Sequence, residues 1–348
     1  MEPAWVDAFQ AVLERCGLKP GDAVAVLRES QSRAVLPELA VLALSRLGCR
    51  AFQIQVPTVF ETSGPAVRST GASTALQQLE PVISALAAST LVVDCTVEGL
   101  MHAPELPAIL RGGARVLYVS NEHPEALVRL LPGDDLEPRV KEHVKRLRAA
   151  THMHVTSGGG TDLQISLAGA TCGGNWGYTT RPGTITHWPG GLALAFPAAG
   201  SVNGTLVLRE GDVNLTFKRY IERPITLRIE DDYITRIVGS GLDAELMRSY
   251  IAGWRDDGSQ ADGGRNAYAV SHVGYGLNPA ARWDSMALYD KRDFNGTELR
   301  AFAGNFLYST GANEVAGRYT RGHFDLPLRN CTVELDGVAV VEAGELLA

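Results

Sequence analysis

Two residues able to bind a metal ion, His323 and Asp325, stand two positions apart near the C-terminus. In a β-strand, side chains i and i+2 point to the same face, so this imidazole and this carboxylate could reach one ion. Phe324 and Leu326 would then face the other way into a core, and Pro327 indicates a strand at a sheet edge or the end of a strand. The spacing therefore predicts half of a metal site.

The best candidate for a third ligand is His272, which lies in the segment Tyr-Ala-Val-Ser-His-Val-Gly-Tyr-Gly-Leu-Asn-Pro. Two histidines and one carboxylate on one side of an ion leave the opposite positions open, which is the arrangement of non-haem Fe(II) oxygenases. The alternative for each of the three is a polar residue that satisfies its hydrogen bonds within the fold, because a His-x-Asp pair is a short pattern.

A second pair with the same spacing, His152 and His154, is a rival metal site. The sequence places no carboxylate beside this pair, which favours a structural role.

Two further histidines are candidates for a binding pocket. His102 follows the apolar run 91–95, and a loop at the carboxyl end of a parallel strand is where such sheets bind ligands. His187 stands beside Trp188 in what we expect to be a loop bounded by glycine and proline, where rigid segments present functional side chains. An ordinary surface-loop histidine is the alternative for His102.

The composition excludes several classes of function. The 348 residues, enough for two domains, include 32 basic and 39 acidic side chains, and no basic run is dense enough for a nucleic-acid footprint. No apolar run reaches the roughly 18 residues that span a membrane, and the N-terminus lacks the pattern of a signal peptide, so we expect a cytoplasmic protein. The five cysteines are widely spaced without a C-x-x-C, which indicates neither a disulfide framework nor a zinc knuckle.

The sequence pattern changes near residue 150. Residues 1–150 alternate short apolar runs with helical segments, which predicts a Rossmann-like, doubly wound parallel-sheet domain, but no G-x-G-x-x-G or Walker sequence supports a nucleotide role. Residues 151–348 read mainly as short alternating strands, which predicts a strand-rich α+β domain that carries the metal ligands. The fold class is therefore α/β. The long loop 55–74 is either an ordered lid or simply mobile.

Several segments together resemble the 2,5-dihydroxypyridine 5,6-dioxygenases, the ring-opening enzymes of nicotinate breakdown. The likeness spans nearly the whole chain and is densest after residue 180. The segments that carry it are His187-Trp-Pro-Gly-Gly191, Gly204-Thr-Leu-Val-Leu208, Ser271-His-Val-Gly-Tyr-Gly-Leu-Asn-Pro279, Gly304-Asn-Phe-Leu-Tyr-Ser-Thr-Gly311 and His323-Phe-Asp-Leu-Pro-Leu-Arg-Asn330.

The resemblance implies an Fe(II)-dependent, extradiol-like dioxygenase that converts 2,5-dihydroxypyridine and O2 to N-formylmaleamate without an organic cofactor. It implies His272, His323 and Asp325 as iron ligands, and it implies His102, His187 and Ser309 as contacts to the substrate or to oxygen. It also suggests a homo-oligomer. A dioxygenase for a related hydroxylated pyridine remains an alternative.

The fold of this family is similar to that of the thermophilic metalloaminopeptidases, which supply the other alternative function. Those enzymes hold two metal ions and need more carboxylates than this chain offers. Leu192 and Ala193 stand where one such carboxylate would follow a similar Pro-x-Gly loop, and a histidine, His272, stands at the place of another. A single His/His/Asp iron site is complete here, whereas a two-metal hydrolase lacks ligands.

Overall fold

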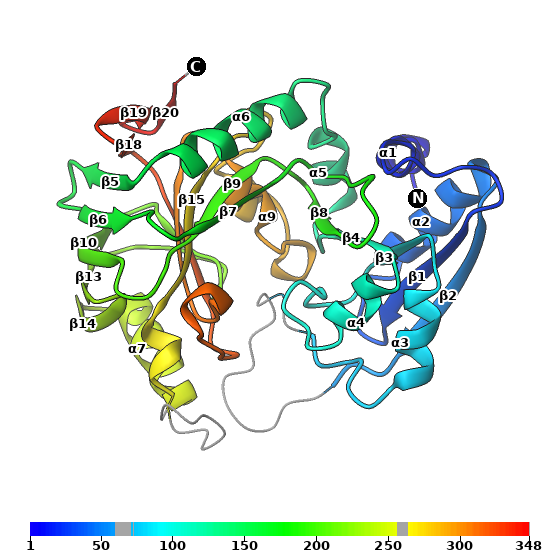
Figure 1. Cartoon of the computed structure of the whole chain (residues 1–348), viewed down its shortest axis with the longest axis horizontal. Coiled ribbons are helices and arrows are strands. Elements are labelled where there is room, and N and C mark those ends of the chain that lie inside the picture. Colours follow the sequence, from blue (N-terminus) through cyan, green and yellow to red (C-terminus); the bar gives the residue numbers. More distant parts are fainter. Residues whose placement is uncertain (60–70, 72, 256–263, 348) are drawn as a thin grey trace.

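In the computed structural model, residues 1–59, 71, 73–255 and 264–347 are described. Figure 1 shows the N-terminal helices and strands, in blue and cyan, on one side of the molecule and the strands of the later sequence on the other. Most of the loop 55–74 lies outside the described residues, so its role as a lid stays a prediction. No helix in the described ranges is both long enough and apolar enough to cross a membrane.

The N-terminal half is built on a parallel sheet. Its order is β2-β1-β3-β4-β8, with β2 (Arg50–Val56), β1 (Ala23–Glu29), β3 (Leu91–Asp94), β4 (Arg115–Val119) and β8 (Ile185–Trp188). Alternate side chains of β1 pack on opposite faces. Val24 and Val26 belong to the core beneath α1 (Pro3–Arg15) and α2 (Val35–Arg46), whereas Ala25 and Leu27 pack with α3 (Glu80–Ala87) and α4 (Leu106–Arg111). The predicted doubly wound sheet is therefore confirmed.

The strand β8 comes from the second half of the sequence yet joins this first sheet. Its His187 pairs in parallel with Tyr118 of β4. The expectation of a loop around His187 was therefore wrong. Residues 185–188 pair with β4 at the side of the sheet, and no local sequence pattern reveals that this side is open. A division of the chain at residue 150 stays a prediction, and any such division must assign β8 to the N-terminal sheet.

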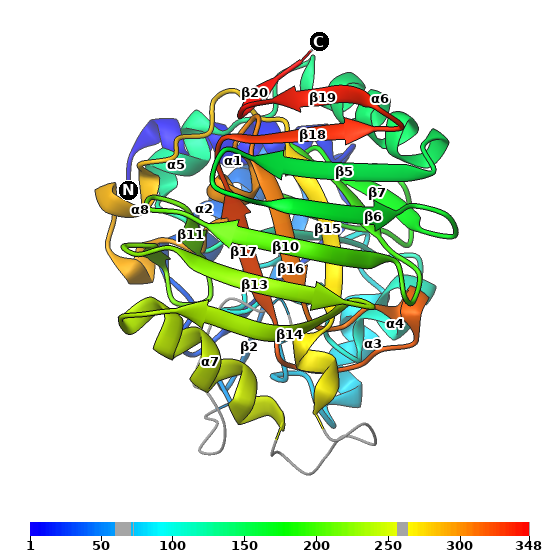
Figure 2. The same cartoon turned by 90° about the vertical axis from the view of Figure 1, so that its left-hand side faces the viewer.

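The second half contains two larger antiparallel sheets (Figure 2). The outer sheet has the order β14 (Tyr233–Gly239), β13 (Ile225–Glu230), β10 (Val202–Leu208), β6 (Asp162–Ser166), β5 (His152–Ser157), β18 (Cys331–Leu335), β19 (Val338–Glu342) and β20 (Glu345–Leu346). The inner sheet has the order β17 (Phe324–Leu328), β16 (Phe306–Thr310), β15 (Val270–Gly276), β9 (Leu192–Phe196) and β7 (Thr171–Asn175). Apolar side chains of both sheets form one buried core.

Helices cover the margins of these sheets. The helix α6 (Leu136–Ala149) contributes Val140 and Val144 to the core and packs on β7 and β9, and α7 (Leu242–Arg255) packs on β14. The remaining described elements are α5 (Pro124–Arg129), β11 (Val213–Asn214), β12 (Arg219–Tyr220), α8 (Ser285–Leu288), α9 (Thr297–Ala301) and the short 3-10 turns Arg265–Tyr268, Lys291–Asp293 and Glu314–Ala316.

The strand β17 has the form that its sequence predicts. It lies at the edge of the inner sheet, where Pro327 is tolerated, and Phe324 and Leu326 are buried in the core. A hairpin around Asp336 and Gly337 joins β18 and β19.

Candidate metal centre

Neighbouring strands of the inner sheet bring the predicted ligands together. His272 lies on β15, Asp325 lies on β17, and His323 immediately precedes β17. Between them runs β16, whose Ser309 is the register partner of Asp325. Because antiparallel partners share one face of a sheet, the strand order places these side chains on a common surface although the sequence separates them widely.

The three side chains are close enough to share one ion. Their candidate ligand atoms all lie within 4.8 Å of one another. His323 Nε2 lies 3.1 Å from Asp325 Oδ2, and His272 Nε2 lies 3.8 Å from Asp325 Oδ1. For comparison, neighbouring ligands of a first-row ion, each at about 2.1 Å and at right angles to one another, lie about 3 Å apart.

The protonation states suit metal ligands. Burial lowers the pKa of His272 to about 3, so this imidazole is neutral at neutral pH. Burial alone would raise the pKa of Asp325, but Arg300 and the two histidines outweigh it, and the net pKa lies well below the usual range. Metal binding requires a neutral imidazole and an ionised carboxylate, and the fold supplies both.

One buried nitrogen indicates that these residues fit an ion. Nδ1 of His272 is buried without a hydrogen-bond partner, and its Nε2 is beyond hydrogen-bond range of Asp325 Oδ1. A buried polar atom without a partner is costly, and an ion bound at Nδ1 would remove that cost. Two imidazoles and one carboxylate are a donor set suited to a divalent transition metal.

The three residues predicted to contact the substrate lie at different places around the triad. Ser309 donates its hydroxyl proton to Asp325 Oδ1. The ring of His102 lies 5.9 Å from that of His323, measured between centroids. His187 is half-buried on β8, and its pKa responds to the charges of Arg300 and Asp325.

Both histidines are neutral near pH 7. The ring of His102 is exposed, yet the surrounding protein removes part of its hydration and lowers its pKa to about 4, and His323 lowers it further. Burial lowers the pKa of His187 to about 4 as well, although a hydrogen bond to the carbonyl of Pro189 opposes this shift. Nδ1 of His187 lies 2.8 Å from that carbonyl oxygen, which would accept a proton carried on Nδ1, and 2.6 Å from the amide nitrogen of Asn175, which would donate to an unprotonated Nδ1.

The loop that carries His102 is folded by a residue that we did not predict, Asp94 at the end of β3. Its Oδ1 accepts hydrogen bonds from the backbone N–H and the hydroxyl of Thr96, and its Oδ2 accepts one from the N–H of Leu100 at 2.9 Å. An Asp two residues before a Thr at a strand end is a turn signal that could have identified it.

A second unpredicted residue, Arg300 on α9, contacts the triad directly. Its Nε donates to Asp325 Oδ2 at 2.7 Å. No local pattern in the sequence points to this arginine, because its partner is brought to it only by the packing of α9 against β17.

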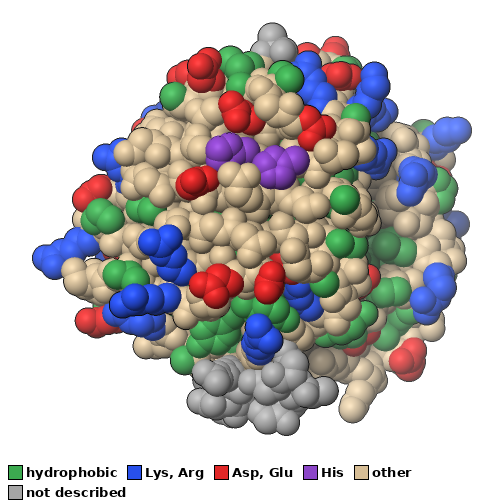
Figure 3. Space-filling model, turned by 60° about the vertical axis from the view of Figure 1, so that its left-hand side comes forward, with side chains coloured by type: hydrophobic (Ala, Val, Ile, Leu, Met, Phe, Trp, Pro, Cys, Tyr) green, Lys and Arg blue, Asp and Glu red, His purple; other side chains and the backbone are tan. Residues whose placement is uncertain are grey.

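The rival pair lies on the surface of the outer sheet, where two histidines stand side by side (Figure 3). Contrary to our expectation, carboxylates do lie beside this pair, because neighbouring strands supply them. Nε2 of His154 lies 2.9 Å from Asp162 Oδ1, and its Nδ1 lies 3.6 Å from Glu334 Oε2. Within the described ranges, the buried triad meets the distance criterion for a shared metal ion, and the pair His152 and His154 does not. This favours a structural role for the outer pair.

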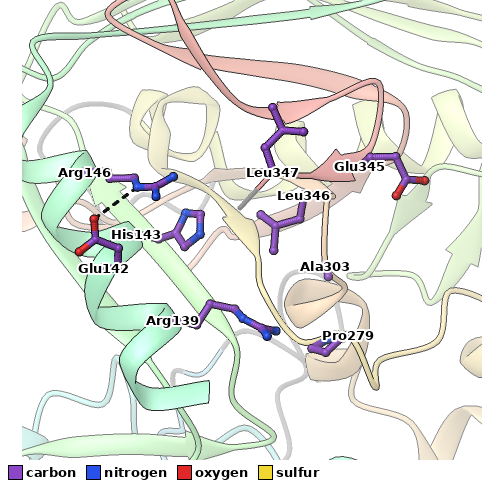
Figure 4. A pocket seen from close by; sticks show the side chains of 9 residues that line it. All are labelled: Arg139, Glu142, His143, Arg146, Pro279, Ala303, Glu345, Leu346 and Leu347. Carbon is purple, nitrogen blue, oxygen red and sulfur yellow. Dashed lines mark hydrogen bonds and ion pairs between the residues drawn. The ribbon is translucent and has the colours of Figure 1, made fainter. Parts of the chain in front are cut away.

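A cavity of about 500 Å³ opens away from the triad, between α6 and the C-terminal segment (Figure 4). Its charged lining is mixed, and Arg146 lies beside Glu142 while Arg139 pairs with Asp135. It contains none of the six predicted site residues.

Comparisons with known proteins show what this chain is similar to. The family model of 2,5-dihydroxypyridine 5,6-dioxygenase matches residues 4–348. A protein of that name from Pseudomonas putida (strain KT2440) is 38% identical over 344 residues, which are 98% of this chain and 95% of the relative.

Solved structures give the same result. The structure of 2,5-dihydroxypyridine dioxygenase from Pseudomonas putida KT2440 superimposes with a TM-score of 0.90 at 36% identity, covering 99% of this chain and 97% of the other. AmpT from Thermus thermophilus matches with a TM-score of 0.69 at 16% identity over 99% of both chains, which shows a shared fold alone. The expected fold relation to the thermophilic metalloaminopeptidases is thereby confirmed.

Proposed function

Because the chain belongs to the 2,5-dihydroxypyridine 5,6-dioxygenase family, we propose that it opens the ring of 2,5-dihydroxypyridine with O2 to give N-formylmaleamate, using Fe(II) held by His272, His323 and Asp325. The observation that carries the proposal is the buried triad, whose ligand atoms lie within 4.8 Å of one another. Iron bound there supplies the redox chemistry that lets O2 react with an aromatic ring.

The residues of the chain prepare the site for that ion. The pKa of His272, at about 3, keeps its imidazole neutral, and the lowered pKa of Asp325 keeps its carboxylate charged. Ser309 and Arg300 each donate to a different oxygen of that carboxylate, so its orientation is fixed without the ion. Three protein ligands on one side of the ion leave positions for the substrate and for O2.

Two histidines are suited to proton transfer. In the tautomer of His187 that donates from Nδ1 to the Pro189 carbonyl, Nε2 can accept a proton from a ring hydroxyl. His102 is exposed and lies beside His323, where it can hydrogen-bond a ring oxygen of a bound substrate. Both imidazoles are neutral at neutral pH, so each has a lone pair that can accept a hydrogen bond or a proton.

A metalloaminopeptidase-type hydrolase has less support. Leu192 and Ala193, which occupy the place of a carboxylate in such enzymes, are buried aliphatic side chains of β9. A two-metal site needs acidic ligands there to bridge the ions. A related hydroxylated pyridine as substrate stays an alternative, and the homo-oligomeric state and the cytoplasmic location stay predictions.

The proposal is tested by oxygen uptake. Protein loaded anaerobically with Fe(II) is mixed with 2,5-dihydroxypyridine while dissolved O2 and the ultraviolet band of the ring are followed together. We expect one O2 to be consumed for each ring lost. Uptake without ring loss, or no uptake by protein with confirmed bound iron, would contradict the proposed reaction on this substrate.

A further inference from the structure

We propose that Arg300 is a positioning residue for the metal ligand Asp325, and that Glu122, at the carboxyl end of the parallel sheet, fixes the short helix that carries Arg300. The inference rests on the proposed function in one respect, namely that an ion binds at the triad.

The first step is the contact between Arg300 and the ligand. Arg300 Nε lies 2.7 Å from Asp325 Oδ2, and its Nη1 lies 3.2 Å from the side-chain oxygen of Asn295. The arginine side chain is 13% exposed and that of Asp325 is 5% exposed, so solvent screens the contact only weakly. A planar guanidinium that donates in two directions at once holds the carboxylate at a set orientation.

The second step is the anchoring of α9. This helix has five residues, too few to be stable alone. Glu122 is fully buried, and its Oε1 accepts the N–H groups of Gly296 and Thr297, both at 2.9 Å. Its Oε2 accepts the N–H of Asn295 at 3.0 Å. One buried carboxylate therefore satisfies three backbone donors at the start of α9.

The third step joins the two halves of the molecule. Glu122 follows β4, and the hydroxyl of Tyr118 on β4 accepts a hydrogen bond from the amide of Asn295 at 3.1 Å. Asn295 in turn accepts from Arg300. A continuous set of hydrogen bonds thus runs from the carboxyl end of the parallel sheet to a ligand on the inner antiparallel sheet.

Electrostatics and positioning make opposite predictions for this arginine. A cation beside the site repels a divalent ion, so removing its charge would tighten metal binding if charge were its main effect. Loss of orientation at a ligand instead weakens metal binding, typically by about 10- to 100-fold. Arg300→Lys keeps the charge and removes the planar fork, so it isolates the positioning effect.

The test measures Zn(II) affinity by competition with a chromophoric chelator for wild type, Arg300→Lys, Arg300→Gln and Glu122→Gln. Two matched controls are Arg282→Lys, at an exposed arginine that pairs with Asp284, and Glu125→Gln, at an exposed glutamate. The visible spectrum of Co(II)-loaded protein reports the arrangement of the ligands, and the melting temperature of each variant reports its folding.

We expect both Arg300 variants to bind Zn(II) about 10- to 100-fold more weakly, with a changed Co(II) spectrum. Arg300→Lys should keep a melting temperature close to wild type, whereas Arg300→Gln should lower it because the buried Asp325 carboxylate loses its cation. Glu122→Gln should weaken binding and also lower the melting temperature, because its amide group meets backbone donors. Arg300→Lys with wild-type affinity and spectrum, or tighter binding by Arg300→Gln, would overturn the inference. If His323→Ala binds Zn(II) as tightly as wild type, the metal site of the proposed function fails instead.

Discussion

The two histidine pairs of this protein have carboxylates within reach, but they differ in burial. At the outer pair, the His154 side chain is 31% exposed and its partner Asp162 is 70% exposed. At the triad, the side chains of His272 and Asp325 are 9% and 5% exposed. Water solvates and screens the outer ion pairs, which makes such contacts nearly neutral in free energy. Proximity of histidine and carboxylate is therefore insufficient, and burial with an unsatisfied nitrogen distinguishes the candidate metal centre.

The largest expected effect comes from removing triad ligands. Asp325→Ala or His323→Ala should lose the bound iron and lower the turnover by at least about 10³-fold, because the metal and its charge partner disappear together. The double variant His152→Ala/His154→Ala should keep both properties near wild type. Metal analysis and oxygen uptake measure the two outcomes. Iron loss in the His152→Ala/His154→Ala variant would show that the outer pair, and not the triad alone, binds the metal.

A smaller effect is expected at His187. His187→Ala should keep full iron content and lower kcat by about 10²- to 10⁴-fold, because a proton acceptor is removed while the ligands remain. The control is His152→Ala, which removes an imidazole from β5 of the outer sheet. Wild-type kcat in His187→Ala would show that its imidazole only supports the fold.

A still smaller effect is expected at Asp94. Asp94→Asn replaces one carboxylate oxygen, a hydrogen-bond acceptor, with an amide group that donates, which should loosen the turn that carries His102. We expect kcat/KM to fall by up to about 10²-fold while the iron is retained. Asp22→Asn, at a turn away from the site, is the matched control. Unchanged kcat/KM in Asp94→Asn would mean that the loop holds His102 without this carboxylate.

The smallest effect concerns a buried histidine outside the site, His143. Burial, followed by the charge of Arg146, lowers its pKa to about 4. In the unfolded chain its pKa returns to about 6.5, so below that pH the unfolded state takes up a proton that the native state excludes, and stability falls toward pH 4.

Relative to His143→Gln, wild type should lose about 2 kcal/mol of unfolding free energy between pH 7 and pH 5. Urea unfolding at both pH values measures this difference. Equal pH dependence in the two proteins would show that His143 titrates normally in spite of its burial.

Much of the fold was predictable from local patterns. Apolar runs alternating with helical segments identified the doubly wound sheet. The alternation around His323 and Asp325 identified the strand β17, and Pro327 indicated either a sheet edge, which is where β17 lies, or a strand end. The expectation failed where pairing was non-local. His187 lies on a strand, and not in the expected loop, because β4 offers an open edge.

The site was predictable to a similar extent. The residue types and the family motifs named the triad, His102, His187 and Ser309, and the structure brings the triad together. Asp94 and Arg300 were missed. A local turn pattern could have identified Asp94. The contact between Arg300 and Asp325 forms only when α9 packs against β17, so no local pattern could have identified Arg300.

The sequence by itself determined which side chains share a face, since strand periodicity is a property of neighbouring residues, and it determined the family through the combined motifs. Only the tertiary structure decided that His272 meets His323 and Asp325, that the outer histidines receive carboxylates yet stay solvated, and that Arg300 contacts Asp325. These outcomes depend on the order of strands and on the depth of burial, which are set by packing between segments far apart in the chain.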